Sequence, residues 1–413
     1  MQNLETVKLG DISEVITNKI NVSKLEKSNY ISTENMLPNR GGIYEATNLP
    51  NILLTPSFQV NDILVSNIRP YFKKIWYAKF SGGCSNDVLI FRAKQNTDPK
   101  FLYYVLSDDR FFRYAMSTSK GTKMPRGDKI AIMKYQVLKF DMGVQKKIAA
   151  VLSALDDKIE LNNKINQNLE QQAQAIFKSW FVDFEPFGGK MPDDWQYVQL
   201  DEVADFTGGY SYKGNELQPS KYAMATIKNF ERKGGFKLDG YKEIIPSDKC
   251  RIEQEAGLYD ILVAHTDLTQ NADVIGNAEL LLCTDKYEKI VFSMDVVKVV
   301  SKNNMPHFVL ATILKSKEFK SHCLGYVNGT TVLHLSKKAL PDYIIYIPKD
   351  LSTLTQLEES LKNIYALISN NLYENNKLIQ LRDALLPKLM SGEIDVSKVD
   401  ISDTQMSFNS NEV

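Results

Sequence analysis

The sequence has few of the residues that build disulfide frameworks, metal centres or membrane spans. Its 413 residues include only four cysteines and four histidines. The cysteines lie far apart and never form a CxxC pair, so we expect the reduced thiols of a cytoplasmic protein and no zinc site. No stretch approaches 18 uninterrupted apolar residues, and the N-terminus does not read as a secretory signal. We therefore expect neither a membrane protein nor a secreted one.

Motifs of several enzyme classes are also missing. There is no P-loop, no glycine-rich dinucleotide fingerprint and no evident Ser/His/Asp set. A degenerate nuclease pattern remains, in which Pro192-Asp193 is followed by Glu231, Arg232 and Lys233. Such a PD…ExK set can support metal-assisted phosphodiester cleavage, but Asp193 falls in an expected linker and not on a strand beside the glutamate. We expect no catalytic residue and no metal site in this chain.

The net charge is zero, but the charges are unevenly distributed. Residues 1–140 carry 20 Lys and Arg against 12 Asp and Glu. Two segments are especially basic: Arg110 to Lys139 has eight Lys and Arg and one acid, and Lys298 to Lys338 has seven Lys and one acid. Two basic segments on a neutral chain suit a polyanion held at two places, although solvated lysine faces would give the same counts.

Internal repeats indicate that the chain is a duplication. "VKLGDI" from Val7 matches "VQLDEV" from Val198, and "NDILVSN" from Asn61 matches "YDILVAH" from Tyr259. Three further matches follow in the same order, ending with "KGTKMPRGDK" from Lys120 against "NGTTVLHLSK" from Asn328. Each copy is rich in short β-branched runs bounded by turn residues, with one helix of apolar periodicity from Lys100 in the first copy. We expect two duplicated α+β domains.

A long helix follows each copy. From Ile148 to Trp180, apolar residues and two asparagines alternate at steps of four and three, which is the seam of a coiled coil. The same spacing recurs from Leu357 to Leu389, where Arg382 is also a seam position. Each seam has two asparagines one step apart: Asn162 and Asn166 in the first helix, Asn371 and Asn375 in the second. Two such helices in one chain most simply pack antiparallel as a spacer between the domains.

Two domains with basic segments, set apart by a helical spacer, suggest recognition of double-stranded DNA at two places. Phosphate contacts need Lys, Arg and backbone N–H groups, and base contacts need forked or short polar side chains. Glycine-containing loops offer both kinds of group in each copy. The alternative is that each of these loops is only a solvent-exposed turn that does not bind DNA. The predicted DNA-binding residues are Lys19, Arg69, Lys73, Lys120, Thr122, Lys123 and Arg126 in the first copy, and Tyr210, Ser211, Tyr212, Lys213, Asn328, Thr330, Thr331, His334 and Lys337 in the second.

The end of the first helix is uncharged, glutamine-rich and aromatic, which favours a further protein partner. The residues predicted to form this surface are Gln167, Gln171, Gln174, Phe177, Trp180 and Phe181. A helical hairpin that only stabilises the chain is the alternative.

Two segments resemble a known family. "ALDDKIELNNKINQNLEQQAQAIFKSWFVDFEP" from Ala154 and "LRDALLPKLMSGEID" from Leu381 are similar to the central and distal conserved regions of type I restriction–modification DNA specificity subunits. The resemblance implies a non-catalytic subunit in which each domain reads one half of a bipartite, asymmetric DNA site. It also implies that the helices set the gap between the half-sites and dock two methyltransferase subunits. S-adenosylmethionine would then be bound by those subunits and no cofactor by this chain, and a nuclease/translocase subunit would join through them.

The resulting domain prediction runs along the chain as follows: a first recognition domain over 1–142, a central helix over 143–186, a second recognition domain over 187–350 that begins with a linker at 187–195, a distal helix over 351–392, and a polar, frayed tail over 393–413. A stand-alone PD…ExK nuclease and a non-catalytic repeat scaffold remain alternative functions.

Overall fold

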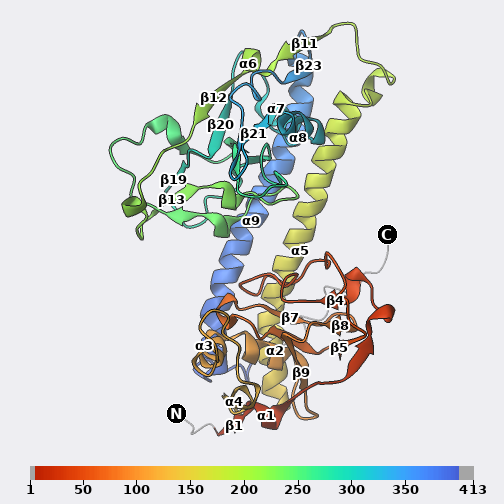
Figure 1. Cartoon of the computed structure of the whole chain (residues 1–413), viewed down its shortest axis with the longest axis vertical. Helices are drawn as coiled ribbons and strands as arrows, with labels where there is room; N and C mark the ends of the chain where they lie inside the picture. The colour runs from red at the N-terminus through yellow and green to blue at the C-terminus, as the bar shows by residue number, and fades with distance from the viewer. Residues whose placement is uncertain (1–4, 400–413) are drawn as a thin grey trace. The chain divides into compact units, whose positions relative to one another are not determined.

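The computed structural model describes residues 5–399, which divide into two compact units (Figure 1). Unit 1 comprises residues 5–159 and 378–399, and unit 2 comprises residues 160–377. Among these residues, no helix is long and apolar enough to cross a membrane. The four cysteines are free thiols, three of them buried.

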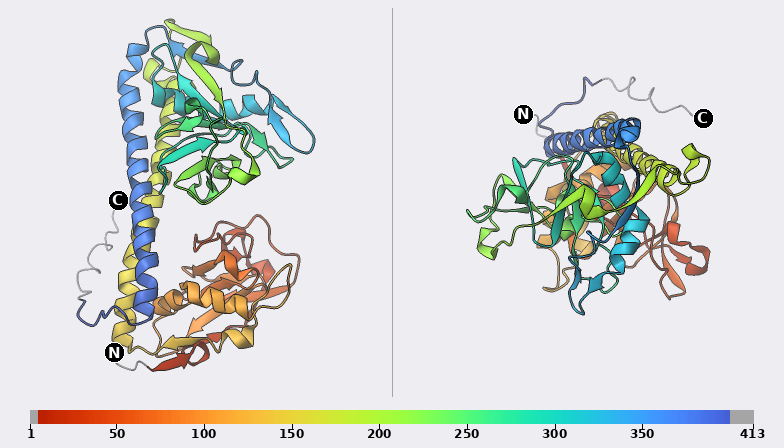
Figure 2. Two further views of the ribbon diagram at one scale, coloured as in Figure 1. Left: turned by 90° about the vertical axis from the view of Figure 1, so that its left-hand side faces the viewer. Right: turned by 90° about the horizontal axis from the view of Figure 1, so that it is seen from above.

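Two long helices contribute to both units. Helix α5 (Met142–Phe181) and helix α9 (Thr355–Met390) each pass from one unit into the other at the division between them (Figures 1 and 2). Within unit 2, hydrogen bonds join Asn162 to Asn375 and Asn166 to Asn371, so the two helices are antiparallel there. In unit 1, Asp156 pairs with Arg382 while Leu152 and Leu386 share one core, which gives the same direction. The predicted antiparallel helix pair is confirmed.

Unit 1 carries two four-stranded sheets and a two-stranded ribbon. The first sheet has the order β2-β9-β6-β7 and is antiparallel throughout. The second has the order β3-β5-β8-β4, and β4 runs parallel to β8. The ribbon joins β1 to β10. The strands are β1 (Thr6–Lys8), β2 (Ser13–Val15), β3 (Lys19–Asn21), β4 (Tyr30–Ile31), β5 (Leu54–Phe58), β6 (Ile63–Ser66), β7 (Ile75–Tyr77), β8 (Gly82–Cys84), β9 (Val88–Ala93) and β10 (Gln136–Leu138).

Unit 2 repeats the first sheet and the ribbon of this topology and three strands of the second sheet. Its sheets have the orders β12-β20-β16-β18 and β14-β13-β19-β15, and its ribbon joins β11 to β23. The predicted duplication into two α+β domains is confirmed by the shared strand order of the first sheet and by the parallel pair in each second sheet, β4 with β8 and β13 with β19. The second sheets differ in one edge strand, because β3 pairs with β5 in unit 1 and β14 pairs with β13 in unit 2. A three-stranded sheet, β17-β22-β21, corresponds to two isolated bridges in unit 1, Ile68 with Arg126 and Lys120 with Arg126. The strands are β11 (Trp195–Gln199), β12 (Ala204–Gly208), β13 (Tyr222–Ala225), β14 (Lys242–Glu243), β15 (Glu255–Ala256), β16 (Ile261–Ala264), β17 (Thr266–Asp267), β18 (Ala278–Leu280), β19 (Lys289–Phe292), β20 (Val296–Ser301), β21 (Val327–Asn328), β22 (Leu333–Leu335) and β23 (Ile344–Pro348).

The single helix expected from Lys100 is two helices, so that expectation is wrong. Helix α2 ends at Ser107 and α3 begins at Asp109, because Asp108 is extended and its carboxylate accepts a hydrogen bond from the Arg110 N–H. Ser316 makes the same break between α7 and α8 in unit 2. The short helices are α1 (Leu9–Ile12), α2 (Pro99–Ser107), α3 (Asp109–Ser117), α4 (Lys129–Ile132), α6 (Leu200–Val203), α7 (His307–Leu314) and α8 (Lys317–Leu324).

The seam of the long helices is part of the core of each unit. Ile148 and Leu152 of α5 join Leu386 and Leu389 of α9 in the core of unit 1. Leu169 and Ala173 join Leu357, Leu361 and Ile368 in the core of unit 2. Burial of each such leucine or isoleucine side chain contributes about 1.5–3 kcal/mol, so the helices stabilise the domains that they carry.

The expectation of a frayed tail after Gly392 is wrong for residues 393–399. Val396 is buried in the core of unit 1, with Ile394 and Val399 packed beside it. Lys147 on α5 donates a hydrogen bond to the Ser397 carbonyl, which fixes this segment further. Residues 400–413 of the predicted tail lie outside the described residues.

Candidate nucleic-acid interface

In unit 1 the predicted loop around Lys123 is a closed hairpin-like turn. Lys120 and Arg126 exchange backbone hydrogen bonds of 2.9 and 3.0 Å, and the Arg69 N–H donates to the Pro125 carbonyl at 2.8 Å. Gly121 has φ +92°, a conformation that other residues rarely adopt. Thr122 and Lys123 are therefore presented at an exposed tip between two anchored ends.

The cationic side chains of this loop differ in whether a nearby carboxylate neutralises them. Lys120 pairs with Asp128 at 2.9 Å, and Arg126 Nε lies 3.2 Å from Asp87. The hydrogen bond that Lys120 donates to Asp128 raises the pKa of Lys120. Both pairs are exposed, and such pairs contribute only about 0–1 kcal/mol, so a phosphate can replace the carboxylate. Lys123 forms no ion pair with any of residues 5–399, which makes it the freer cation.

Arg69 contacts this loop through its backbone, Lys19 lines a separate cavity, and Lys73 is engaged in an ion pair. Lys19 lines a cavity of about 160 Å³ together with Asn86 and Lys129, beside the Asp87 partner of Arg126. Arg69 has a buried Nε without a hydrogen-bond partner. Lys73 pairs with Asp109 at 2.8 Å, a carboxylate that also binds Arg40. Burial raises the pKa of Asp109, but its bonds to Lys73 and Arg40 lower it more.

The equivalent loop of unit 2 is the hairpin of β21 and β22. Gly329 has φ +114°, and a Cβ at this position would lie 2.2 Å from the Val332 carbonyl oxygen, so only glycine fits. The tip carries the predicted residues Asn328, Thr330 and Thr331, which are exposed. Gln270 donates to the Thr330 carbonyl at 2.6 Å and steadies the tip from the side.

His334 and Lys337 follow the hairpin tip, and both are exposed. The Nδ1 of His334 lies 3.3 Å from the Thr266 hydroxyl on β17. The neighbouring His265 has a lowered pKa because it is buried and because it lies near His334. The lowered pKa favours the neutral imidazole of His265, which acts as a hydrogen-bonding group.

A shared hydrogen-bond junction places the loops of both units. In unit 1, the Asn67 N–H donates to the Asp87 carbonyl at 2.8 Å, and the Gly127 N–H donates to the Asn67 carbonyl at 3.2 Å. In unit 2, the His265 N–H donates to the Asp295 carbonyl and the Leu335 N–H donates to the His265 carbonyl, at 2.8 and 2.9 Å. The duplication thus preserves the connection between the basic loop, the central strand and the turn that precedes β9 or β20.

The loop 209–213 meets this junction, but Tyr210 cannot contact DNA directly. Its side chain is 4% exposed, and its hydroxyl bonds to Glu216 and Ser247 at 2.7 and 2.8 Å. The prediction of Tyr210 as a DNA-binding residue is therefore corrected: the ring supports the loop from below. Ser211 and Lys213 are exposed, and Tyr212 is half-buried with the Lys242 ammonium 5.6 Å from its ring centre.

The predicted partner surface on α5 is also divided by burial. Gln167 and Gln171 are exposed and Gln174 is half-buried. Phe177 is 7% exposed within the core of unit 2, so it is not an open contact. Trp180 and Phe181 pack against Phe187 and Trp195, with ring centres 5.4 Å apart in both pairs. The aromatic end of α5 thus anchors the linker, and the exposed glutamines remain the part available to a partner.

Sequence reasoning missed three features of these surfaces. The sequence around Asp87 and Asp295 indicated only a repeated strand, whereas in the structure these turns bind Asn67 and His265 and so connect to the predicted DNA-binding loops. Lys129 was not singled out. The exposed ring pair Tyr71 and Phe72, beside Arg69, follows a proline in "IRPYFKK", and that turn signal could have identified it.

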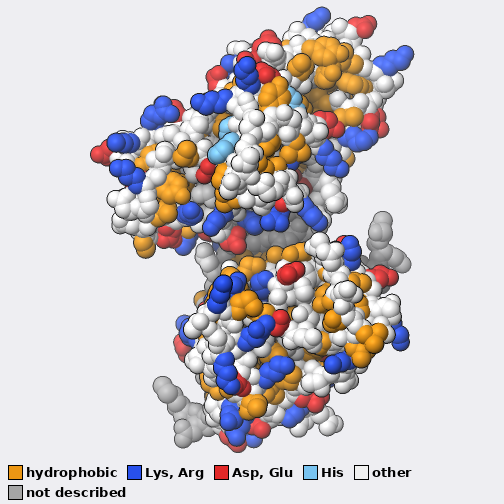
Figure 3. Space-filling view, in the orientation of Figure 1, with side chains coloured by type: hydrophobic (Ala, Val, Ile, Leu, Met, Phe, Trp, Pro, Cys, Tyr) orange, Lys and Arg blue, Asp and Glu red, His pale blue; other side chains and the backbone are white. Residues whose placement is uncertain are grey.

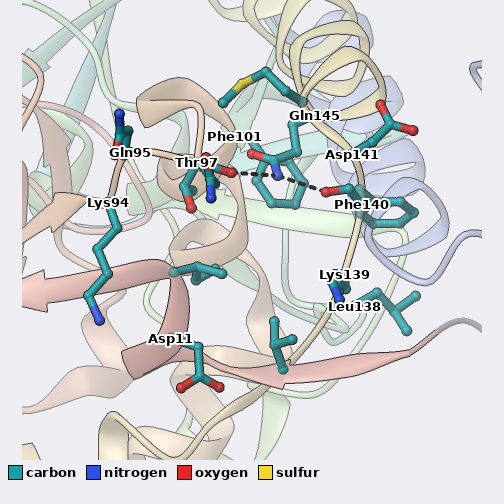
Figure 4. A pocket seen from close by; sticks show the side chains of 14 residues that line it. Asp11, Lys94, Gln95, Thr97, Phe101, Leu138, Lys139, Phe140, Asp141 and Gln145 are labelled. Carbon is teal, nitrogen blue, oxygen red and sulfur yellow. Dashed lines mark hydrogen bonds between the residues drawn. The ribbon is translucent and has the colours of Figure 1, made fainter.

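Lysine and arginine side chains are spread over the visible face of unit 1 in Figure 3. A cavity of about 540 Å³ in the same unit has a different character (Figure 4). Its wall includes Gln145, whose amide donates to the Asn96 and Phe140 carbonyls and accepts from the Asp98 N–H. Because the hydrogen-bonding groups of that amide are already bound to the backbone, we interpret the cavity as a space between packed elements at the start of α5 and not as a binding site.

Known proteins resemble this chain over most of its length. Residues 1–171 match the family model described as type I restriction modification DNA specificity domain. The HindI specificity subunit of a type I restriction enzyme from Haemophilus influenzae is 25% identical, over 95% of this chain and 100% of that one. The MjaIX specificity subunit from Methanocaldococcus jannaschii is 24% identical, over 74% of this chain and 71% of that one. The crystal structure of a type I restriction–modification S subunit from M. genitalium shares the fold with a TM-score of 0.55 and 16% identity, over 94% and 97% of the two chains.

Proposed function

We propose that the chain is a DNA specificity subunit of a type I restriction–modification system and that it selects the DNA sequence on which such a complex acts. Each unit reads one half of a bipartite, asymmetric site. Unit 1 uses the loop around Lys123, and unit 2 uses the hairpin tip around Thr330 together with the loop at Ser211. The two halves differ in sequence because the loops differ in chemistry.

The observation that carries this proposal is the duplicated junction. The same two backbone hydrogen bonds, through Asn67 in unit 1 and His265 in unit 2, place a basic or polar loop against the turn before a central strand. The framework is kept while the tip changes from Lys-Gly-Thr-Lys to Asn-Gly-Thr-Thr. A constant framework with different tips is what reading two different half-sites requires.

The helices supply the second part of the proposal. Because α5 and α9 both run through the two units, they set the number of base pairs between the half-sites. Their exposed face, which includes Gln167 and Gln171, docks two methyltransferase subunits. S-adenosylmethionine is bound by those subunits, and a nuclease/translocase subunit joins through them. The complex acts in the cytoplasm, where its DNA is.

We propose no catalytic role for this chain. The nuclease alternative would need Asp193 and Glu231 at one metal. Asp193 precedes β11, whereas Glu231 lies in the turn that joins Phe230 to Phe236, and its carbonyl accepts a hydrogen bond from Asn277. Within residues 5–399, no three His, Cys, Asp or Glu side chains are grouped to hold a metal ion.

Methylation mapping tests the proposal. The chain is purified with its methyltransferase subunits, supplied with S-adenosylmethionine, and the methylated adenines are mapped on genomic DNA. A single bipartite, asymmetric motif is the expected result. Metal-dependent cutting by the chain alone, lost in Glu231→Ala, would support the nuclease instead. DNA binding without any sequence preference would leave only a scaffold role.

A further inference from the structure

Two aromatic side chains stand exposed on a short turn in unit 1. Tyr71 and Phe72 belong to the 3-10 turn η3 (Pro70–Phe72), and their side chains are 49% and 38% exposed. Their ring centres lie 4.6 Å apart, so the two rings present one apolar surface. Exposure of two adjacent large rings lowers stability unless another molecule covers them.

The turn is held rigidly in an unfavourable conformation. Arg69 and Lys73, on either side of η3, have φ values of +49° and +51°. Asn39 and Arg40 have φ values of +54° and +62°, and their N–H groups donate to the Phe72 and Lys73 carbonyls at 2.8 and 3.0 Å. Four left-handed residues that are not glycine therefore meet at one turn. Such strain persists where the surrounding structure fixes the backbone, and it is concentrated at functional sites.

Three cations that are not paired with an acid among residues 5–399 lie near the ring pair, while Asp109 neutralises Lys73 and Arg40 at the same turn. Arg69 precedes it and is tied by its N–H to Pro125 in the predicted DNA-binding loop. Arg113, on the helix α3 that lies against η3, is exposed and has no ion pair within the described chain. The Lys74 ammonium lies 5.9 Å from the Phe72 ring centre. The surface is apolar at its centre and cationic at its edge, which matches a nucleic-acid duplex better than an ordinary protein surface.

Unit 2 has an exposed apolar residue at the matching place in the repeat. Leu268 directly follows β17 and corresponds to Pro70 when the two copies are aligned at Asn67 and His265. The side chain of Leu268 is 65% exposed. Met294, in the turn that joins the loops of unit 2, is 61% exposed. Both copies thus keep an uncovered apolar side chain beside their polar loops, although the residue types differ.

We propose that Tyr71 and Phe72 form an aromatic wedge that packs against a base step of the bound duplex and partly unstacks it, with Leu268 as the smaller counterpart in unit 2. The wedge rests on the proposed function and adds a contact to it. Apolar side chains inserted at a base step allow a duplex to bend around a protein, and flanking cations hold the phosphates on either side. Larger rings in unit 1 mean a greater distortion of the half-site read by that unit.

The test uses the complex with its methyltransferase subunits and a duplex of the mapped methylation motif. 2-Aminopurine replaces one base at a time outside the methylated adenine, because its fluorescence rises on unstacking. The wild-type complex is expected to raise fluorescence at one step of one half-site. Tyr71→Ser with Phe72→Ser should abolish that rise and weaken binding by roughly 5- to 100-fold, as expected for the loss of about 1–3 kcal/mol of stacking.

Three controls make the result specific. Tyr71→Phe keeps a ring and should keep the signal. Leu53→Ser removes a 72% exposed side chain elsewhere in unit 1 and should change nothing. A duplex with an abasic site at the affected step is already unstacked, so it should restore most of the affinity of the double serine variant.

The possible outcomes distinguish failure of the aromatic wedge from failure of the proposed DNA specificity. If the complex methylates no defined sequence, the proposed function fails and the wedge fails with it. If methylation is specific but the double serine variant keeps wild-type affinity and fluorescence, only the wedge is overturned. If that variant no longer assembles with the methyltransferase on gel filtration, the rings cover a protein contact and the wedge is likewise overturned.

Discussion

Asn162 on α5 donates a hydrogen bond to the Oδ1 of Asn375 on α9 across 2.9 Å, at a position of the seam where both residues are buried. Asn371 donates to Asn166 Oδ1 at 2.8 Å one turn further along. The Oδ1 of Asn162 is itself buried without a hydrogen-bond partner. Buried asparagines in a helix seam lower stability but allow one register only. These four residues therefore fix how the two helices pair in unit 2.

Replacing this pair by leucine should raise stability and relax the register. We expect Asn162→Leu with Asn375→Leu to increase the thermal unfolding midpoint, because two buried amides give way to apolar packing. Asn375→Ala alone should lower stability by about 1–3 kcal/mol, since it removes one of the two acceptors of Asn162 and the donor to Asn163, and leaves Asn162 with Glu374 only. Gln167→Ala, on the exposed face, is the control for helix substitution. Differential scanning fluorimetry measures all three, and a lower midpoint for the double leucine variant would contradict the assignment.

In unit 1 an ion pair takes the place of the asparagines. Arg382 Nη1 lies 2.8 Å from Asp156 Oδ1, and the Tyr104 hydroxyl donates to the other oxygen of Asp156 at 2.7 Å. Burial lowers the pKa of Arg382, but Asp156 and Asp383 raise it by a larger amount, and burial together with Asp156 raises the pKa of Tyr104. Asp156→Ala should therefore destabilise unit 1 by about 1–3 kcal/mol, because it leaves the Nη1 of a largely buried guanidinium without its acceptor while the Asp383 contact remains.

The double variant Asp156→Ala with Arg382→Leu is the matched control for that effect. It removes both charges and should recover most of the lost stability in urea unfolding. If the double variant instead lost the sum of the unfolding free energies lost by Asp156→Ala and Arg382→Leu, the interaction between these two residues would not be the source of the stability.

The long-range architecture was predictable because it rests on periodicity and repetition. The four-three spacing from Ile148 and from Leu357 identified many of the residues that the structure buries between the helices, including Asn162, Asn166 and Asn375, but not Tyr365 or Leu386. Tyr210 was assigned wrongly because its partners Glu216 and Ser247 depend on how the chain folds back over 37 residues. The break at Asp108 was missed although a second aspartate follows it, since helical periodicity continues across the cap.

Lys123 should contribute one phosphate contact, and Asp87 should oppose binding. Lys123→Ala is expected to weaken DNA binding and to lower the slope of log K against log salt by about 0.9, because one fewer counterion is released. Asp87→Asn frees Arg126 from its partner and should tighten binding, with a slope about one unit steeper. Lys139→Ala, which removes an exposed lysine paired with Glu5, is the control. Fluorescence anisotropy titrations at several salt concentrations decide this, and an unchanged slope would place Lys123 off the DNA.

Asp267 should make the stability of unit 2 depend on pH. Its carboxylate is 1% exposed and accepts hydrogen bonds from the Thr269 N–H, the Thr269 hydroxyl and the Val274 N–H. Burial raises the pKa of Asp267, but these hydrogen bonds lower it more, so the folded-state pKa lies below the ordinary value of about 3.9. A depressed carboxylate pKa adds stability above the unfolded-state pKa, and this stability is lost as the pH falls through the folded-state value.

We therefore expect Asp267→Ala to destabilise unit 2 by about 1–3 kcal/mol at pH 7 and by less at pH 3. Asp205→Ala, which removes an exposed carboxylate paired with Lys302, should have little effect at either pH. Urea unfolding at the two pH values provides the comparison. An equal loss of unfolding free energy at pH 7 and pH 3 would mean that the charge of Asp267 does not stabilise the 267–274 loop.

Lengthening both helices should change the gap in the DNA site and nothing else. One heptad inserted after Glu160 in α5 and one after Lys377 in α9, where the chain passes between its units, keeps the four-three seam in phase. Seven residues add about 10.5 Å of helix, which corresponds to roughly three base pairs at about 3.4 Å each. Methylation mapping should then recover the same two half-sites separated by about three more base pairs. A heptad inserted in α5 alone shifts the Asn162 and Asn375 partners and should impair methylation of every site. Altered half-sequences, or an unchanged gap in the doubly lengthened chain, would contradict the role of the helices as the ruler of this complex.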